Sequence, residues 1–103
     1  ETVTAIENLD AILALDKVHG VFIGPSDLAA SMGKIGQGND PELIARCIKA
    51  IRKIKAAGKI AGILTAHEEL IQQSADAGAN FTGIGFDTLL LGEALRQRAA
   101  SRP

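Results

Sequence analysis

The sequence predicts an α/β protein with a parallel β-sheet. Three short apolar segments, at residues 21–23, 59–64 and 80–84, have the length and composition of buried strands. Segments with apolar residues at helical spacing precede, separate and follow them, so every connection between strands contains a helix. Such crossovers join parallel strands and are right-handed. The expected order is helix, strand, helix, strand, helix, strand, helix.

Composition excludes several functional classes. The chain has 103 residues, of which 47% are apolar, enough for the core of one domain at most. Its formal charge is −1 and three residues are aromatic, so nothing indicates nucleic-acid binding. No apolar run approaches the ~18 residues of a membrane span, and no signal-peptide pattern opens the chain. Cys47 is the single cysteine, which fits a reducing compartment, and we expect a cytoplasmic protein.

The stretch from Gly24 to Asp27 joins the first strand to a small helix at residues 28–32. Gly24 and Pro25 end the strand, because proline cannot donate to a β-ladder and glycine permits a sharp turn. Ser26 and Asp27 are both favourable N-cap residues. Each therefore has two interpretations: a helix cap, or a ligand at the C-terminal edge of the sheet, where α/β folds place their chemistry. A substrate carboxylate could bind the Ser26 backbone N–H in either case.

The other helices have recognisable ends. Residues 4–16 form the first helix, and the glycine-rich stretch 33–39 is a surface loop that lacks a phosphate-binding motif. Asp40 and Pro41 start a helix that ends near residue 57. Thr65 and Glu68 form a capping box that opens a helix to residue 77. The last helix, after Asp87, carries a broad apolar surface of four leucines and an alanine.

The remaining reactive side chains favour structural roles. Cys47 lies on the apolar stripe of its helix and is expected to be a core thiol. His67 is expected on a solvated first helical turn, and His19 at the opposite end of the sheet from Asp27. Neither histidine is placed as a catalytic base, and for Asp87 the helix-cap interpretation is favoured.

Residues 21–33, Val-Phe-Ile-Gly-Pro-Ser-Asp-Leu-Ala-Ala-Ser-Met-Gly, resemble a segment of the HpcH/HpaI aldolases. Glu1-Thr2 and Glu7 to Ile12 match the family segment that begins at a metal-binding glutamate, and the spacing from Glu1 to Asp27 also fits. Similar matches occur at residues 57–65 and 78–90. Gly36-Gln37-Gly38-Asn39-Asp40-Pro41 differs from the family's typical Gly-Asn-x-x-His-Pro, so that histidine is absent here.

This resemblance implies a (β/α)8 TIM barrel, of which residues 1–103 are the C-terminal portion within a single domain. It also implies metal-dependent class II aldolase activity: cleavage of a 4-hydroxy-2-oxo acid to pyruvate and an aldehyde, through an enolate that the metal stabilises. The implied partners are this small-molecule acid and other copies of the chain in a homo-oligomer, with neither nucleic acid nor membrane.

The resemblance assigns Glu1 and Asp27 to a divalent cation, and Ser26 and Asp27 to the substrate. Parallel strands lie about 4.8 Å apart, so carboxylates at their C-terminal ends can share a cation. Two carboxylates suit Mg²⁺ or Mn²⁺, with Co²⁺ as a further candidate. The family's catalytic His and Arg precede residue 1, so no catalytic residue is assigned in this chain, and the isolated fragment is expected to be inactive. Lys59 begins its strand, away from the edge where a Schiff-base lysine would act.

Two alternatives remain at this stage. The fragment could be a non-catalytic half-barrel that uses its apolar last helix to assemble with another chain. It could also belong to a citrate-lyase-like relative that uses the same metal pair on a different acid.

Overall fold

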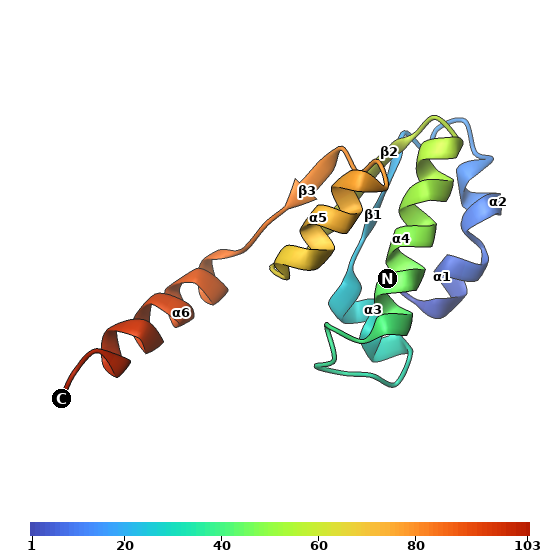
Figure 1. The fold of residues 1–103 in the computed structure, drawn as a ribbon. Coiled ribbons are helices and arrows are strands. Elements are labelled where there is room, and N and C mark those ends of the chain that lie inside the picture. The colour runs from blue at the N-terminus through green and yellow to red at the C-terminus, as the bar shows by residue number, and fades with distance from the viewer.

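The computed structural model describes residues 1–103 as six helices and a three-stranded parallel sheet, in the spatial order β1-β2-β3. The predicted α/β class and the parallel sheet are confirmed (Figure 1). The elements are α1 (Val3–Glu7), α2 (Leu9–Leu13), β1 (Gly20–Ile23), α3 (Pro25–Ser31), α4 (Pro41–Ala56), β2 (Ile60–Leu64), α5 (Glu68–Asp76), β3 (Phe81–Gly83) and α6 (Asp87–Ala100).

Helices cover one face of the sheet and form the core with it. Ile23, Ala61 and Ile63 point to this face and are buried, while α4 contributes most of the opposing side chains. The helix α4 begins as predicted, because Asp40 Oδ1 accepts a hydrogen bond from the Leu43 N–H at 3.0 Å. The buried residues of α4 are Leu43, Cys47, Ala50, Ile51 and Ile54.

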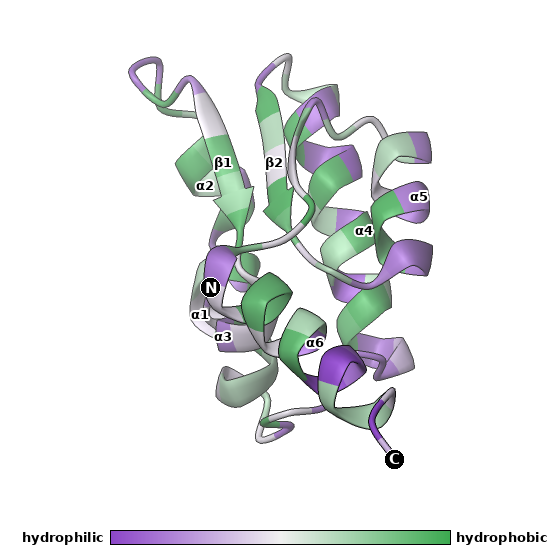
Figure 2. Ribbon diagram, turned by 90° about the vertical axis from the view of Figure 1, so that its left-hand side faces the viewer, coloured by the Kyte–Doolittle hydropathy of each residue, from purple (hydrophilic) through white to green (hydrophobic).

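The opposite face of the sheet has no helix over it. In Figure 2, β1 and β2 lie on one side of the molecule, with α4 and α5 on the other. The strand register places Gly62 between Phe22 and Phe81, whose rings meet edge to face with centroids 5.4 Å apart. Phe81 is 63% exposed, and Phe22, Ile60 and Leu64 are exposed on the same face. A second layer is therefore needed to bury this surface.

Three predicted helix starts or spans differ from the structure. The helix expected over residues 4–16 is two short helices, because Asn8 leaves helical geometry at φ −88° and ψ 6°. The helix α3 is capped by the Gly24 backbone, with Pro25 in the first turn, so Ser26 and Asp27 are not its N-cap. The helix α5 starts two residues later than expected, with His67 as its N-cap instead of Thr65.

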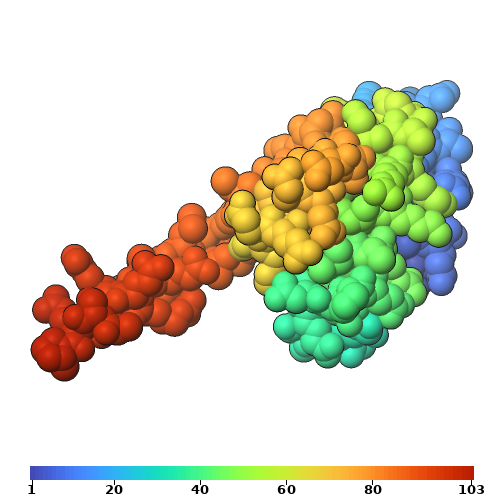
Figure 3. Space-filling model, viewed as in Figure 1, coloured from blue at the N-terminus to red at the C-terminus, as the bar shows by residue number.

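The last helix stands away from the rest of the molecule. It has no buried residue, and Figures 1 and 3 show it projecting from the end of β3 as an arm. The molecule consequently measures 58 × 27 × 21 Å along its principal axes. As expected, the leucines of α6 form a broad apolar surface, and they are largely exposed. None of the six helices has the length and apolar character required to cross a membrane.

Candidate functional site

Two carboxylates converge at the C-terminal end of β1. The strand ends at Ile23, and the backbone turns at Gly24 into the first turn of α3, which carries Asp27. A carbon placed at the Cβ position of Gly24 would lie 3.2 Å from Oε1 of Glu1 and 3.4 Å from Oδ2 of Asp27. Both carboxylates therefore reach one small volume, which stays open because residue 24 has no side chain.

Neither carboxylate has a structural task within the chain. Asp27 is in the first turn of α3 but makes no side-chain cap hydrogen bond, so its interpretation as a helix cap is wrong. Both side chains are exposed, and neither takes part in a salt bridge. Their oxygens are hard donors of the kind that Mg²⁺ and Mn²⁺ take, so the residues present fit a divalent cation.

Glu1 and Asp27 would provide two of the ligands that such a cation needs. No group of three or more His, Cys, Asp or Glu side chains is placed to hold a metal ion. A six-coordinate cation here would complete its shell with water and with oxygen atoms of a substrate. This geometry suits a site in which a substrate binds directly to the cation.

Ser26 lies between this pair and a neighbouring pocket. It occupies the first turn of α3, where helical N–H groups have no intrahelical acceptor. Its side chain is exposed and borders a pocket of about 320 Å³ together with Leu64, Thr65 and His67. Ser26 is therefore available to contact a ligand that reaches from the carboxylates into the pocket.

The two histidines lie at opposite ends of the sheet. His19 precedes β1 and its carbonyl accepts the Ile60 N–H at 3.1 Å, as expected for the end far from Asp27. His67 is exposed, as predicted, and its ring lies against Gly38 of the glycine-rich loop, at the edge that carries the carboxylates. No local sequence pattern predicts the contact between residues 38 and 67. The position of His67 soon after β2 could, however, have placed it at the edge of the sheet that carries the carboxylates.

Lys59 and Cys47 have structural roles. The Lys59 ammonium donates to the carbonyl oxygens of Leu15 at 2.9 Å and of Val18, at the N-terminal end of the sheet. Burial raises the pKa of the Cys47 thiol to about 11 and leaves it fully enclosed in the core. At neutral pH the thiol is protonated and inert, as the sequence predicted.

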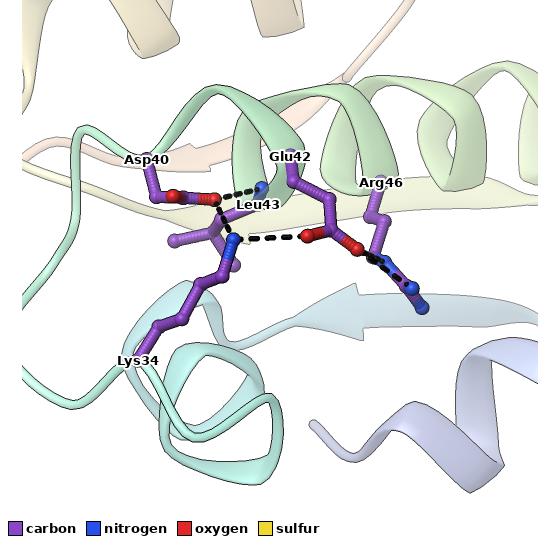
Figure 4. A network of polar contacts seen from close by, with 5 residues as sticks. All are labelled: Lys34, Asp40, Glu42, Leu43 and Arg46. Atoms are coloured by element: carbon purple, nitrogen blue, oxygen red, sulfur yellow. Dashed lines mark hydrogen bonds and ion pairs between the residues drawn. The ribbon is translucent and has the colours of Figure 1, made fainter.

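A charged cluster joins Lys34, near the start of the glycine-rich loop, to the N-terminal end of α4 (Figure 4). The Lys34 ammonium lies 2.8 Å from Asp40 Oδ1 and 2.9 Å from Glu42 Oε2, and Arg46 donates to Glu42 Oε1 at 2.9 Å. The hydrogen bond from Lys34 is the main reason that the pKa values of Asp40 and Glu42 are lowered, and the Asp40 carboxylate raises the pKa of Lys34. The cluster thus holds the loop that carries Gly38 beside the pocket.

Comparison with known proteins adds sequence and structural relatives. A family model described as HpcH/HpaI aldolase/citrate lyase matches residues 1–94. The hydroxypyruvate/pyruvate aldolase of Roseobacter denitrificans is 50% identical over 88% of this chain and 36% of its own length. The 2-keto-3-deoxy-L-rhamnonate aldolase of Escherichia coli is 46% identical over 97% of this chain and 38% of its own length.

A solved structure has the same fold. The HpcH/HpaI aldolase of Desulfitobacterium hafniense superposes on the whole chain with a TM-score of 0.87 and 28% sequence identity, over 41% of its own length. The chain thus spans little more than a third of the relatives' sequences. The prediction that its sheet is a portion of a larger (β/α)8 barrel is confirmed, and such a barrel accounts for the open face over Phe22 and Phe81.

Proposed function

The chain belongs to the HpcH/HpaI aldolase/citrate lyase family, and from this we propose that the complete protein is a carbon–carbon lyase that releases pyruvate. Its substrate would be a 4-hydroxy-2-oxo acid, its second product an aldehyde, and its cofactor a divalent cation. Residues 1–103 would be the C-terminal part of one barrel domain. The observation that carries this proposal is the convergence of Glu1 and Asp27 over Gly24.

Glu1 and Asp27 would hold the cation, and Ser26 would orient the substrate. When bound, Mg²⁺ or Mn²⁺ would supply Lewis acidity to the carboxylate and keto oxygens of a 2-oxo acid. The Ser26 N–H, in the first turn of α3, would donate to the substrate carboxylate. Gly24 would keep the space between the carboxylates clear for these oxygens.

The reaction breaks the bond between C3 and C4 of the substrate. The 4-hydroxyl loses its proton as the aldehyde carbonyl forms, the bonding electron pair stays on the pyruvate fragment, and C3 then takes up a proton. No residue of this chain is assigned to these proton transfers, and we expect the rest of the barrel to supply the groups that perform them.

The test measures pyruvate release by the complete protein. Activity should require added Mg²⁺ or Mn²⁺, disappear with a chelator, and fall at least a hundredfold in Asp27→Asn, which keeps the shape of the side chain but removes its charge. Asp16→Asn is the matched control, because Asp16 is exposed in a turn and makes no salt bridge. Full activity in Asp27→Asn, or in chelator, would contradict the proposal.

Two other candidate functions are favoured by specific observations. The exposed α6 and the uncovered sheet face fit a chain that assembles with another copy or another part of the barrel. The matched family also includes citrate lyases, so the same carboxylate pair could act on a different acid. A panel of 2-oxo acids and citrate-like acids, assayed with the complete protein, separates these candidates.

A further inference from the structure

A pocket of about 320 Å³ opens beside the candidate cation pair. Its walls come from separate parts of the chain: the start of α3, the glycine-rich loop, the end of β2, the N-cap of α5 and the first turns of α6. Leu64, Phe86 and Leu89 form its apolar part. The volume is at the small end of the range for ligand pockets and suits a fragment of a few heavy atoms. Ser26 lines this pocket and directly precedes Asp27 of the candidate cation pair.

His67, the N-cap of α5, lines this pocket with an exposed side chain. Its backbone N–H donates to the Thr65 hydroxyl at 3.2 Å, and its ring nitrogen Nε2 lies against Gly38. A Cβ at residue 38 would stand closer to Nε2 than real atoms approach. The backbone of Gly38 is not left-handed, so the imidazole is the group that a side chain at residue 38 would displace. The loop in turn is fastened by the Lys34 cluster.

The charge of the pocket limits what it can bind. Glu93 is the only acidic residue among the lining residues, which include no lysine or arginine. An aldehyde that ends in a carboxylate would meet Glu93 without a cation to offset the repulsion. A neutral fragment that carries a hydroxyl can instead bond to the His67 imidazole, which acts as donor or acceptor.

We propose that this pocket binds the aldehyde-derived half of the substrate, and that His67 selects a short, neutral hydroxyaldehyde by a hydrogen bond to its hydroxyl. This inference rests on the proposed function, because the pyruvate half would lie on the cation between Glu1 and Asp27. Ser26 would then mark the junction between the two halves. His67 is accordingly a specificity-determining residue that the family resemblance did not assign.

The experiment uses the complete protein in the direction of carbon–carbon bond formation. Pyruvate is combined with glycolaldehyde, a hydroxyaldehyde; with propionaldehyde, which lacks the hydroxyl; and with succinic semialdehyde, which ends in a carboxylate. The exchange of pyruvate methyl protons for deuterium is measured separately, since it needs no aldehyde. We expect the unsubstituted protein to prefer glycolaldehyde to propionaldehyde by about five- to tenfold, the factor that one neutral hydrogen bond supports.

His67→Ala should abolish this preference, and Gly38→Ala should reduce it by displacing the ring. Glu93→Gln should raise kcat/KM for succinic semialdehyde by about threefold or more. His19→Ala, at the far end of the sheet, is the matched control and should leave the preference intact. Circular dichroism verifies folding, and Gly38→Ala tests the proposal independently if His67→Ala does not fold.

The outcomes separate the two proposals. If the unsubstituted protein exchanges pyruvate protons but His67→Ala keeps the preference for glycolaldehyde, the role of His67 is wrong while the proposed function stands. An unsubstituted protein that prefers succinic semialdehyde would also overturn the pocket assignment. Failure of the unsubstituted protein to exchange pyruvate protons with any divalent cation would overturn the proposed function, and this inference with it.

Discussion

At the scale of single residues, Ser74 is the polar side chain of the core whose hydroxyl has no hydrogen-bond partner. A buried, unpaired hydroxyl costs about 1–3 kcal/mol of desolvation. We therefore expect Ser74→Ala to raise the free energy of unfolding by about 1 kcal/mol, as measured by urea denaturation of the complete protein. Ser31→Ala is the control with the opposite sign, because the Ser31 hydroxyl accepts the Val3 N–H at 3.0 Å. An unchanged or lower stability in Ser74→Ala would contradict the expectation.

Cys47 gives a dependence of stability on alkaline pH. Its pKa is raised by burial from 9.0 in the unfolded chain to about 11 in the folded state. The stabilisation is complete below pH 9 and is lost as the pH rises through 11, because the unfolded thiol ionises first. We expect no reaction with a thiol reagent at pH 8 until the protein unfolds. Between pH 9 and 11, the free energy of unfolding should fall less in Cys47→Ala than in the unsubstituted protein. An equal fall in the two proteins would mean that other groups cause it.

Residue roles were predictable where the helical pattern decides them. The apolar stripe of α4 placed Cys47 in the core correctly. The same reasoning overlooked Ser74, four residues after buried Leu70 on the same helical face. The contact between His67 and Gly38 depends on how a loop folds across a strand end. No periodicity encodes that kind of contact.

At the scale of elements, the Lys34 cluster fastens the glycine-rich loop to the start of α4. The lowered pKa values of Asp40 and Glu42 mean that the cluster stabilises the fold above pH 4.5 and loses this effect as the pH falls through their folded values, which lie below 3.8 and 4.5. The raised pKa of Lys34 keeps the cluster intact up to at least pH 10.5.

We expect Lys34→Gln to increase amide hydrogen exchange in residues 34–43 by several-fold at pH 7, and to have little further effect near pH 3. Lys55→Gln is a suitable control, since Lys55 lies in the last turn of α4, far from the glycine-rich loop, and forms no salt bridge. Unchanged exchange in the loop of Lys34→Gln would show that the backbone alone fixes it.

The bare sheet face depends on one close approach. A Cβ on Gly62 would overlap the ring of Phe22, and that ring also packs on Phe81. We expect Gly62→Ala to destabilise the complete protein by about 1–3 kcal/mol, the usual range for overpacking. Gly33→Asn serves as the control, because Gly33 has a left-handed backbone and open space around it, and asparagine tolerates that conformation. A neutral Gly62→Ala would mean that Phe22 moves aside without cost.

Element boundaries were predictable where a side chain caps a helix through its own neighbours. Asp40 and Pro41 mark the start of α4 correctly because the Asp40 carboxylate accepts the N–H of Leu43, three residues further on. The start of α5 was misplaced, since Thr65 instead accepts the His67 N–H and lies buried behind the strand end. The start of α3 was also misplaced, because Gly24 occupies the N-cap position that was expected for Ser26 or Asp27.

At the scale of the whole molecule, the sheet has an uncovered apolar face and two unpaired edges. Such surfaces associate with other chains in water. We expect residues 1–103, expressed alone, to self-associate with rising concentration in light-scattering measurements. Phe81→Lys should weaken this association because Phe81 lies on the bare face, whereas Leu95→Lys, on α6, should have a smaller effect. A greater effect of Leu95→Lys would locate the contact on the arm; a monomer at all concentrations would remove both explanations.

The sequence also indicated this incompleteness. Three short apolar strands without charged edges cannot be buried by the helices of 103 residues, and the family pattern implied the missing barrel. Neither the projection of α6 nor the pocket between α6 and the loop was foreseeable, because each depends on the relative position of elements that share no local pattern.

Gly24 has a consequence for how this protein can vary. Its backbone, at φ −105° and ψ 92°, is accessible to every amino acid, so folding alone does not demand glycine at this position. The demand comes from Glu1 and Asp27, because a side chain at residue 24 would enter the open space between their oxygens. In a saturation library of the complete protein, selection for abundance should accept small residues at position 24, while selection for catalysis should accept glycine alone. Positions at which a substitution survives selection for abundance but not selection for catalysis are those that the reaction constrains and folding does not.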